Sequence, residues 1–243
     1  MLNPVLVIAR KELVDAWRDR RAVVSAALYA LMGPGVVGMV SLTVHDGGSV
    51  LTAMMSVFTL VAAFVGGMNV ALDAVAGERE RRSLLPLLMH PVGRRDLLLG
   101  KWLAVAVFAL AGLALNVAGF ALLLHRTPRA ALAVGLIPLA MLAAALEVLV
   151  STACRGVKEA HTYLSLLVFA PMGLGMFMVF SPVAGRWWWK YLPVAGQQLQ
   201  LTARGATDPK VVLVLACGTV WLAAVALLLA AQRLEQDDVV YGG

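Results

Sequence analysis

The chain has 243 residues, of which 61% are hydrophobic and only 14% are charged, and its formal net charge is +6. A soluble domain of this length carries about a quarter charged residues. The composition therefore excludes a soluble globular domain and indicates a polytopic membrane protein. Basic loops follow from the topology rule of membrane proteins, so the positive charge is no reason to expect nucleic acid as a partner.

Residues 1–21 predict an amphipathic helix rather than a membrane span. Asn3 suits the N-cap of such a helix, and Pro4 suits its first position. On a helical wheel one face is apolar and the opposite face is charged; the apolar face holds Leu6, Ala9, Leu13, Ala16 and Trp17. We expect this helix to lie in the membrane interface. The alternative is a cytoplasmic amphipathic helix that packs on another protein.

Six apolar segments follow, and each is long enough to cross the hydrocarbon core, which needs about 20 residues of helix. They cover residues 22–43, 50–76, 97–124, 130–152, 160–180 and 211–231. Residues 181–210 are mixed in polarity and hold three consecutive tryptophans at 187–189. We expect a short helix or re-entrant element there, at the outer face. The predicted fold is all-α, with six transmembrane helices.

The distribution of Lys and Arg predicts which side each loop faces. An even number of spans places both ends of the chain on one side. The termini and the loops on that side carry 14 of the 20 cations, and the other side carries 6. The positive-inside rule therefore predicts that both termini are cytoplasmic.

Four polar side chains fall within the predicted spans: Asn69, Asp73, Asn116 and Glu147. Charged groups are costly in a membrane, so a functional role is the default hypothesis for the two carboxylates. Both lie near the cytoplasmic ends of their spans, where they could form a cation entry site. The alternative for Asp73 is snorkelling, or pairing with Arg79 or Arg81. The two asparagines suit hydrogen bonds between helices.

The sequence shows none of the usual catalytic or metal-binding motifs. Gly100-Lys101 would need a glycine at position 95 and Ser or Thr at position 102 to form a phosphate-binding loop, but these are Arg95 and Trp102. The four histidines are scattered over different loops, and Cys154 and Cys217 form no metal or redox pattern. We therefore expect no catalytic residue, no bound metal and no nucleotide site in this chain.

Residues 77–96, which connect the second and third spans, hold the densest cluster of charge. This loop and the following turn contain six cations: Arg79, Arg81, Arg82, Arg94, Arg95 and Lys101. Such a segment cannot lie in hydrocarbon, where each charge costs about 2.5–3.5 kcal/mol on insertion scales. The leucines between positions 84 and 88 give it a short apolar face, which predicts an amphipathic helix on the membrane surface or on a partner. A solvated basic connector is the alternative.

This loop resembles the cytoplasmic loop of type-2 ABC exporter permeases, in particular the sodium-extrusion group. The matching positions are Gly77, Glu78, Arg79, Glu80, Arg81, Ser83, Leu84, Pro86, Leu87, Leu88, Pro91, Val92, Arg94, Gly100 and Lys101. Weaker matches occur at residues 9–13, 158–163 and 192–197, in the family's order. Many sodium-extrusion permeases carry a sizeable extracellular domain after the first span, whereas here residues 44–49 form a short link. The resemblance therefore does not carry the substrate over.

The resemblance implies that residues 78–90 form a coupling helix, which sits in a groove on a separate ATPase subunit. It implies a bacterial inner-membrane transporter of two such permease chains, as a homodimer, and two ATPase chains, with ATP and Mg²⁺ on the ATPase and no cofactor on this chain. Arg79, Arg81 and Arg82 would pair with acidic groups of the ATPase. The implied coupling residues are Glu78, Arg79, Glu80, Arg81, Arg82, Ser83, Leu84, Leu87, Leu88, Val157, Lys158 and Glu159.

Two other functions remain open from the sequence. One is a mechanotransmitting ABC membrane subunit, which passes ATPase-driven motion to a periplasmic or membrane partner. The other is a secondary carrier that works without ATP. The carrier would need charged groups near the middle of the membrane, and the predicted spans hold none there.

Overall fold

The structure is a computed structural model and describes residues 3–43, 48–81, 83, 93–125, 133–181, 186–203 and 208–235. Within these ranges every regular element is a helix or helical turn. In chain order they are α1 (Pro4–Arg18), α2 (Arg20–Thr43), α3 (Gly48–Leu72), the π-helical turn η1 (Asp73–Gly77), α4 (Glu78–Glu80), α6 (Arg94–Leu124), α7 (Ala133–Ala153), α8 (Val157–Phe180), the 3₁₀ turn η4 (Trp189–Tyr191), α9 (Ala195–Thr202) and α10 (Pro209–Glu235).

Six helices of the described chain are long and apolar enough to cross a membrane, which confirms the predicted all-α fold with six spans. The first candidate span is α2, and the second runs without a break from Gly48 to Glu80 through α3, η1 and α4. The other four fall in α6, α7, α8 and α10. The second span was predicted to end at residue 76, and it is longer because helical structure continues through the charged residues 78–80.

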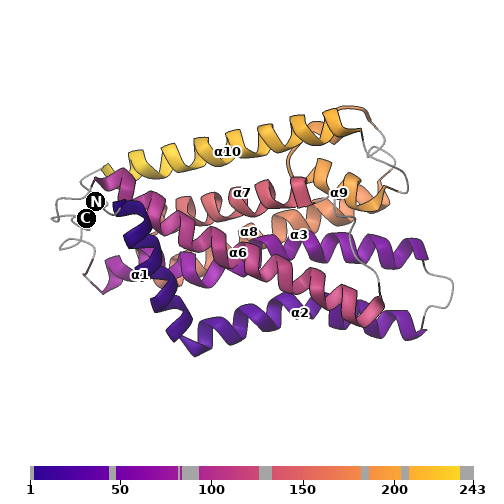
Figure 1. Ribbon diagram of the computed structural model, residues 1–243, viewed down its shortest axis with the longest axis horizontal. Helices are drawn as coiled ribbons and strands as arrows, with labels where there is room; N and C mark the ends of the chain where they lie inside the picture. The colour runs from indigo at the N-terminus through magenta and orange to yellow at the C-terminus, as the bar shows by residue number, and fades with distance from the viewer. Residues whose placement is uncertain are drawn as a thin grey trace.

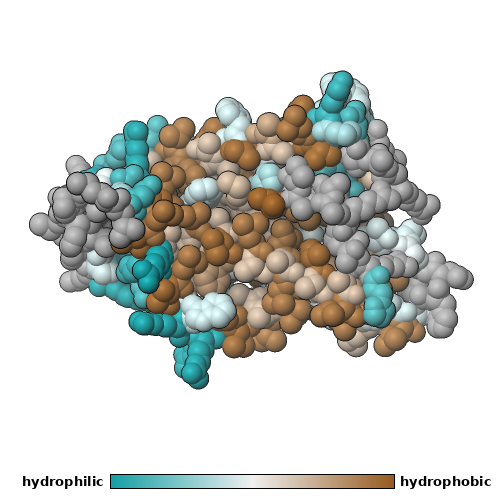
Figure 2. Space-filling view, viewed as in Figure 1, coloured by the Kyte–Doolittle hydropathy of each residue, from teal (hydrophilic) through white to brown (hydrophobic). Residues whose placement is uncertain are grey.

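The long helices run along the longest axis of the molecule, and the short ones lie at its two ends (Figure 1). α1 crosses the direction of the bundle at the end where α10 finishes, and α9 lies at the opposite end. Asn3 caps α1 by accepting a hydrogen bond from the Val5 amide at 3.1 Å, as its position in the sequence predicts. Apolar side chains cover the middle of the visible face, and hydrophilic ones gather toward both ends (Figure 2).

Helix α3 lies at the centre of the bundle, where small residues let backbones approach closely. A Cβ atom built on Gly66 would come within 2.9 Å of the Phe108 carbonyl oxygen, and one on Gly112 would come within 2.8 Å of the Gly66 Cα. α3 and α6 therefore pack backbone against backbone, as helices in a membrane often do. Alanines of α7 and α10 extend this core on its other side, among them Ala143, Ala145 and Ala226.

The two asparagines predicted to join helices do so. The Asn116 amide donates to the Ala30 carbonyl of α2 at 2.8 Å and accepts from the Thr59 hydroxyl of α3 at 3.4 Å. The Asn69 amide donates to the Ser25 hydroxyl of α2 at 2.8 Å. These bonds link the first three spans, and they satisfy polar groups that would otherwise be buried without partners.

The segment after α8 forms the other end of the bundle. The stacked rings of Trp188 and Trp189 lie 4.3 Å apart, and α9 follows them. Three glutamines of α9 are buried. The Gln197 amide donates to the Thr219 hydroxyl of α10 at 3.1 Å, and the Gln198 amide donates to the Ser56 hydroxyl of α3 at 2.8 Å. The short helix expected in this region is thus tied into the bundle by polar side chains.

Candidate functional site

The end of α3 is reshaped by a widened π-helical turn at Asp73–Gly77. The Ala76 amide donates to the Ser151 hydroxyl of α7 at 3.2 Å. Leu234 of α10 packs against Ala74 and Val75 of the same turn. Single π-helical turns inside α-helices are frequent at functional sites. This one sets the direction of Glu78, Arg79 and Glu80, which follow it directly.

These three residues bind residues of four different helices. We refer to Glu78, Arg79 and Glu80, together with the residues that they bind, as the helix junction. Glu78 binds a lysine that is buried in α6. The Lys101 ammonium lies 2.8 Å from the Glu78 carboxylate and 3.0 Å from the Glu12 carboxylate of α1. Its side chain is 1% exposed, and the two carboxylates are 13% and 14% exposed. A buried ammonium is tolerated only when it is paired, and here two carboxylates compensate it.

Lys11 of α1 completes the ionic cluster from its exposed side. Its ammonium lies 3.2 Å from Glu12 and 3.9 Å from Glu78. Burial alone would raise the pKa of the Glu12 carboxyl, but the ammonium groups of Lys101 and Lys11 outweigh burial and hold that pKa below its usual value. Burial would lower the pKa of Lys11, but the carboxylates of Glu12, Glu78 and Asp15 outweigh it and raise that pKa. Glu12 and Lys11 are therefore each held in their charged form by the ions around them.

Arg79 and Glu80 bind the connection between α7 and α8. The Arg79 guanidinium donates to the backbone carbonyl of Cys154, and also to that of Thr152 at 3.1 Å. These carbonyls end α7, where backbone acceptors lack helical partners and a cation is favoured. The Glu80 carboxylate accepts from the Val157 amide at 2.8 Å, at the first turn of α8, where an anion is favoured.

The remaining described residues of the predicted coupling set lie around the junction. The Arg81 guanidinium is 2.9 Å from the Asp73 carboxylate in a pair that is mostly exposed, at 68% and 50%. Ser83 bonds back to the Glu78 carbonyl through its amide at 2.9 Å. Lys158 is exposed, and the Glu159 carboxylate accepts from the Arg155 amide at 2.7 Å. Arg82, Leu84, Leu87 and Leu88, with the rest of the predicted coupling helix, lie outside the described residues.

The partner of Arg79 in the structure differs from the one expected from the sequence. The resemblance implies that Arg79 pairs with acidic groups of an ATPase, but its guanidinium is directed into the chain's own α7–α8 connection. Glu78 and Glu80 are likewise bonded within the chain. The reason is the widened turn before them, which changes the direction of the side chains that follow. Arg81 and Lys158 keep exposed cationic groups at this end of the bundle.

The structure does not bring Asp73 and Glu147 together in one cation site. A Cβ atom built on Gly77 would lie 2.6 Å from an Asp73 oxygen, whereas one on Gly67 would lie 2.7 Å from a Glu147 oxygen. These glycines are ten residues apart on one helix, which corresponds to about 15 Å. Glu147 is 1% exposed, and its carboxyl oxygens have no hydrogen-bond partner within the described part of the chain. Asp73 instead pairs with Arg81, the alternative that the sequence left open.

Sequence reasoning did not single out Glu12, Lys101 or Ser151 as site residues. A signal was present for Lys101, because it is a lysine inside the apolar run of residues 97–124 with no acidic residue one turn away on the same helix. Ser151 carried no signal, since serines are common in membrane helices. Among the described residues, no three His, Cys, Asp or Glu side chains are grouped closely enough to hold a metal ion.

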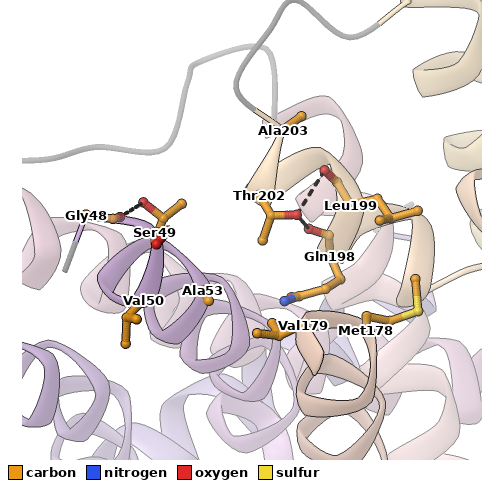
Figure 3. Close-up of a pocket in the computed structure, with 11 residues that line it drawn as sticks. Gly48, Ser49, Val50, Ala53, Met178, Val179, Gln198, Leu199, Thr202 and Ala203 are labelled. Atoms are coloured by element: carbon orange, nitrogen blue, oxygen red, sulfur yellow. Dashed lines mark hydrogen bonds between the residues drawn. The ribbon is translucent and has the colours of Figure 1, made fainter. Parts of the chain in front are cut away.

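Two cavities lie at opposite ends of the bundle. One of about 270 Å³ adjoins the helix junction and is lined by charged groups, among them Glu12, Asp73 and Arg81. The other, of about 900 Å³, opens between α3, α8 and α9 and is lined only by uncharged residues. In it the Thr202 hydroxyl bonds to the backbone of its own helix, while the Gln198 amide nitrogen points toward α3 (Figure 3).

The sequence of the chain is similar to those of one family of membrane proteins. The sequence model of the ABC-2 family transporter proteins matches residues 6–201. The chain is 32% identical over 210 residues to the ABC transporter permease protein NatB of Bacillus subtilis, which covers 78% of this chain and 54% of NatB. It is 38% identical over 111 residues to the probable ABC transporter permease protein NosY of Pseudomonas aeruginosa, and 33% identical over 113 residues to that of Stutzerimonas stutzeri.

The matches to the two NosY proteins cover 41% and 42% of this chain, and 38% of each relative. The chain thus spans about half the length of NatB and less of the NosY proteins. The family model covers most of the chain, including the helix junction, and six helices are suited to cross a membrane. The chain is a multi-pass membrane protein and belongs to the ABC-2 transporter family.

Proposed function

We propose that the chain is the membrane-spanning permease subunit of an ATP-driven ABC exporter, and that it is coupled to a separate ATPase subunit at the end of the bundle that holds the helix junction. The observation that carries this proposal is the bonding of Glu78, Arg79 and Glu80 to residues of four helices. A segment that receives force from a partner must be fixed to the elements that it moves. Family membership and the printed names of the relatives support the same function.

The assembly follows from the family resemblance. We propose two copies of this chain, as a homodimer, with two ATPase chains that bind ATP and Mg²⁺. The helix junction and both termini then face the cytoplasm of a bacterium, in agreement with the bias of 14 cations to 6 in the sequence. The ATPase contacts the part of the predicted coupling segment that follows Glu80, up to residue 90, and the exposed side of residues 157–159, and the cations Arg81 and Lys158 pair with its acidic groups.

The junction gives this coupling a physical route. A displacement of the segment after Glu80 pulls on the Arg79 and Glu80 bonds, which hold the α7–α8 connection. The same displacement acts on α1 and α6 through the Lys101 cluster. Charge-assisted hydrogen bonds are short and directional, so a displacement is passed on with little relative movement of the bonded groups. Four helices would then move together when the ATPase dimer closes.

The test is to co-purify the chain with ATPases that are encoded beside it, and to measure ATP hydrolysis with and without the permease. The proposal expects a stable complex with permease-dependent hydrolysis. An Arg81→Gln/Lys158→Gln variant should weaken association, while the matched Arg186→Gln/Lys210→Gln variant, which changes exposed cations at the other end, should not. Failure to bind any ATPase would favour a secondary carrier. Binding with no turnover response to any substrate would favour a mechanotransmitting subunit.

A further inference from the structure

An apolar groove of about 410 Å³ lies between α1 and α6, on the outer surface next to the helix junction. Its α1 wall consists of Leu13, Val14 and Trp17, and its α6 wall is centred on Val107 and Phe108. Trp17 is 72% exposed, although an indole normally finds cover in a folded protein. Within the described chain, nothing fills this groove.

Each end of the α1 wall carries an arginine. Arg10 and Arg18 both line the groove and both are exposed. They are eight residues apart on α1, which corresponds to about 12 Å. Among the described residues neither guanidinium has a hydrogen bond or ion pair with another side chain, whereas Lys11 between them is paired with Glu12 and Asp15. The groove therefore combines an apolar floor with two unpaired cations.

The groove continues as an apolar track along α6. Val107, Ala111, Ala114 and Ala118 are exposed and follow one another at the spacing of a single helix face. This track leads away from Lys101 and the charged end of the bundle, toward its apolar middle. An occupant would thus be charged at the α1 end and apolar along its length. A helix of another protein is not expected to place an anionic group at the α1 end of the groove.

We propose that this groove binds one anionic phospholipid of the inner leaflet, with its headgroup phosphate between Arg10 and Arg18 and an acyl chain along Val107 and Ala111. Guanidinium groups bind phosphate oxygens in a bidentate manner. The inner leaflet is the source of anionic lipid, and each nearby cation contributes about a fivefold gain in affinity. The proposal needs the chain to lie in a membrane, but it does not rest on coupling to an ATPase.

The test uses the full chain, purified in detergent and stripped of lipid, with dioleoylphosphatidylglycerol and dioleoylphosphatidylcholine as probes. Native mass spectrometry measures the affinity for the first lipid bound. Two arginines predict that the wild type binds the phosphatidylglycerol about 30-fold more tightly than the phosphatidylcholine. The Arg10→Gln/Arg18→Gln variant should lose this preference, while Arg10→Lys/Arg18→Lys should keep most of it.

Two further variants locate the site. Arg155→Gln/Lys158→Gln removes two exposed cations outside the groove and should leave the preference unchanged. Ala111→Phe fills the track and should weaken binding of both lipids, with circular dichroism as the check on folding. Equal affinity of the wild type for the two lipids would overturn the proposal. So would a preference that survives in Arg10→Gln/Arg18→Gln, or a dimer of the chain that buries the groove and excludes lipid.

Discussion

Replacing Lys101 by methionine tests the ionic cluster at the helix junction. The Lys101 ammonium is buried between two carboxylates at 2.8 and 3.0 Å. Methionine keeps the length and the apolar packing of the side chain but removes its charge. The substitution leaves Glu12 and Glu78 mostly buried, with only the exposed Lys11 to compensate them.

The expected cost is about 3 kcal/mol of the free energy of unfolding. Breaking a buried ion pair by removal of one partner typically costs about 3–5 kcal/mol, because the other charge stays buried. We take the lower end because Lys11 remains 3.2 Å from Glu12. Lys11→Met is the matched control and should cost less than about 1 kcal/mol, since its side chain is 54% exposed and its pairs are screened by water.

The assay is unfolding in mixed micelles with increasing sodium dodecyl sulfate, followed by circular dichroism. The triple variant Lys101→Met/Glu12→Gln/Glu78→Gln provides a further test. Since all three charges are removed together, it should be more stable than Lys101→Met alone. The reasoning is refuted if Lys101→Met costs no more than Lys11→Met, or if the triple variant is less stable than the single one.

The remaining predictions use the same assay. Glu80→Ala removes the acceptor for the Val157 amide and should cost about 1 kcal/mol, with Lys158→Ala near zero as its control; equal costs would contradict the capping role. Gly67→Ala places a Cβ atom 2.8 Å from a Val105 side-chain carbon and 2.9 Å from its carbonyl oxygen, so it should cost about 1–3 kcal/mol, while Gly218→Ala, with no atom within 4 Å, should cost nothing. The Glu12 carboxyl has a folded-state pKa below its usual value of 4.5, so its stabilisation is present above that pH and is lost as pH falls through the folded-state pKa. Wild-type stability should therefore drop below about pH 4.5 more steeply than that of Glu12→Gln, and identical pH profiles would show that the pKa is not shifted.

The six spans could be predicted because hydrophobic length is a local property of the sequence. The interhelical roles of Asn69 and Asn116 could also be predicted, since an amide in a membrane helix has few other partners. The structure adds which helices they join: Asn69 joins α3 with α2, and Asn116 joins α6 with both α2 and α3.

The helix junction could not be predicted from any local pattern. Glu12 and Lys101 are 89 positions apart, and neither residue's neighbours specify the other. The π-helical turn before Glu78 holds an extra residue, which changes the helix face on which the following side chains lie. Arg79 therefore points into the bundle, although an amphipathic pattern read at a constant helical period favours a partner outside the chain. Likewise, the sequence shows Glu147 as a carboxylate in a span but not that it lies against Gly67.

The central claim is that the residues after α3 transmit motion to the bundle through bonds within this chain. Arg79→Gln in the reconstituted complex with its ATPase tests it most directly, because this guanidinium binds the end of α7 and not the outer surface. The measurement is ATPase association and permease-dependent ATP hydrolysis on the same folded preparation. The account predicts that association persists while the permease-dependent part of hydrolysis falls about tenfold or more. Loss of association, with normal hydrolysis in the complexes that remain, would contradict it.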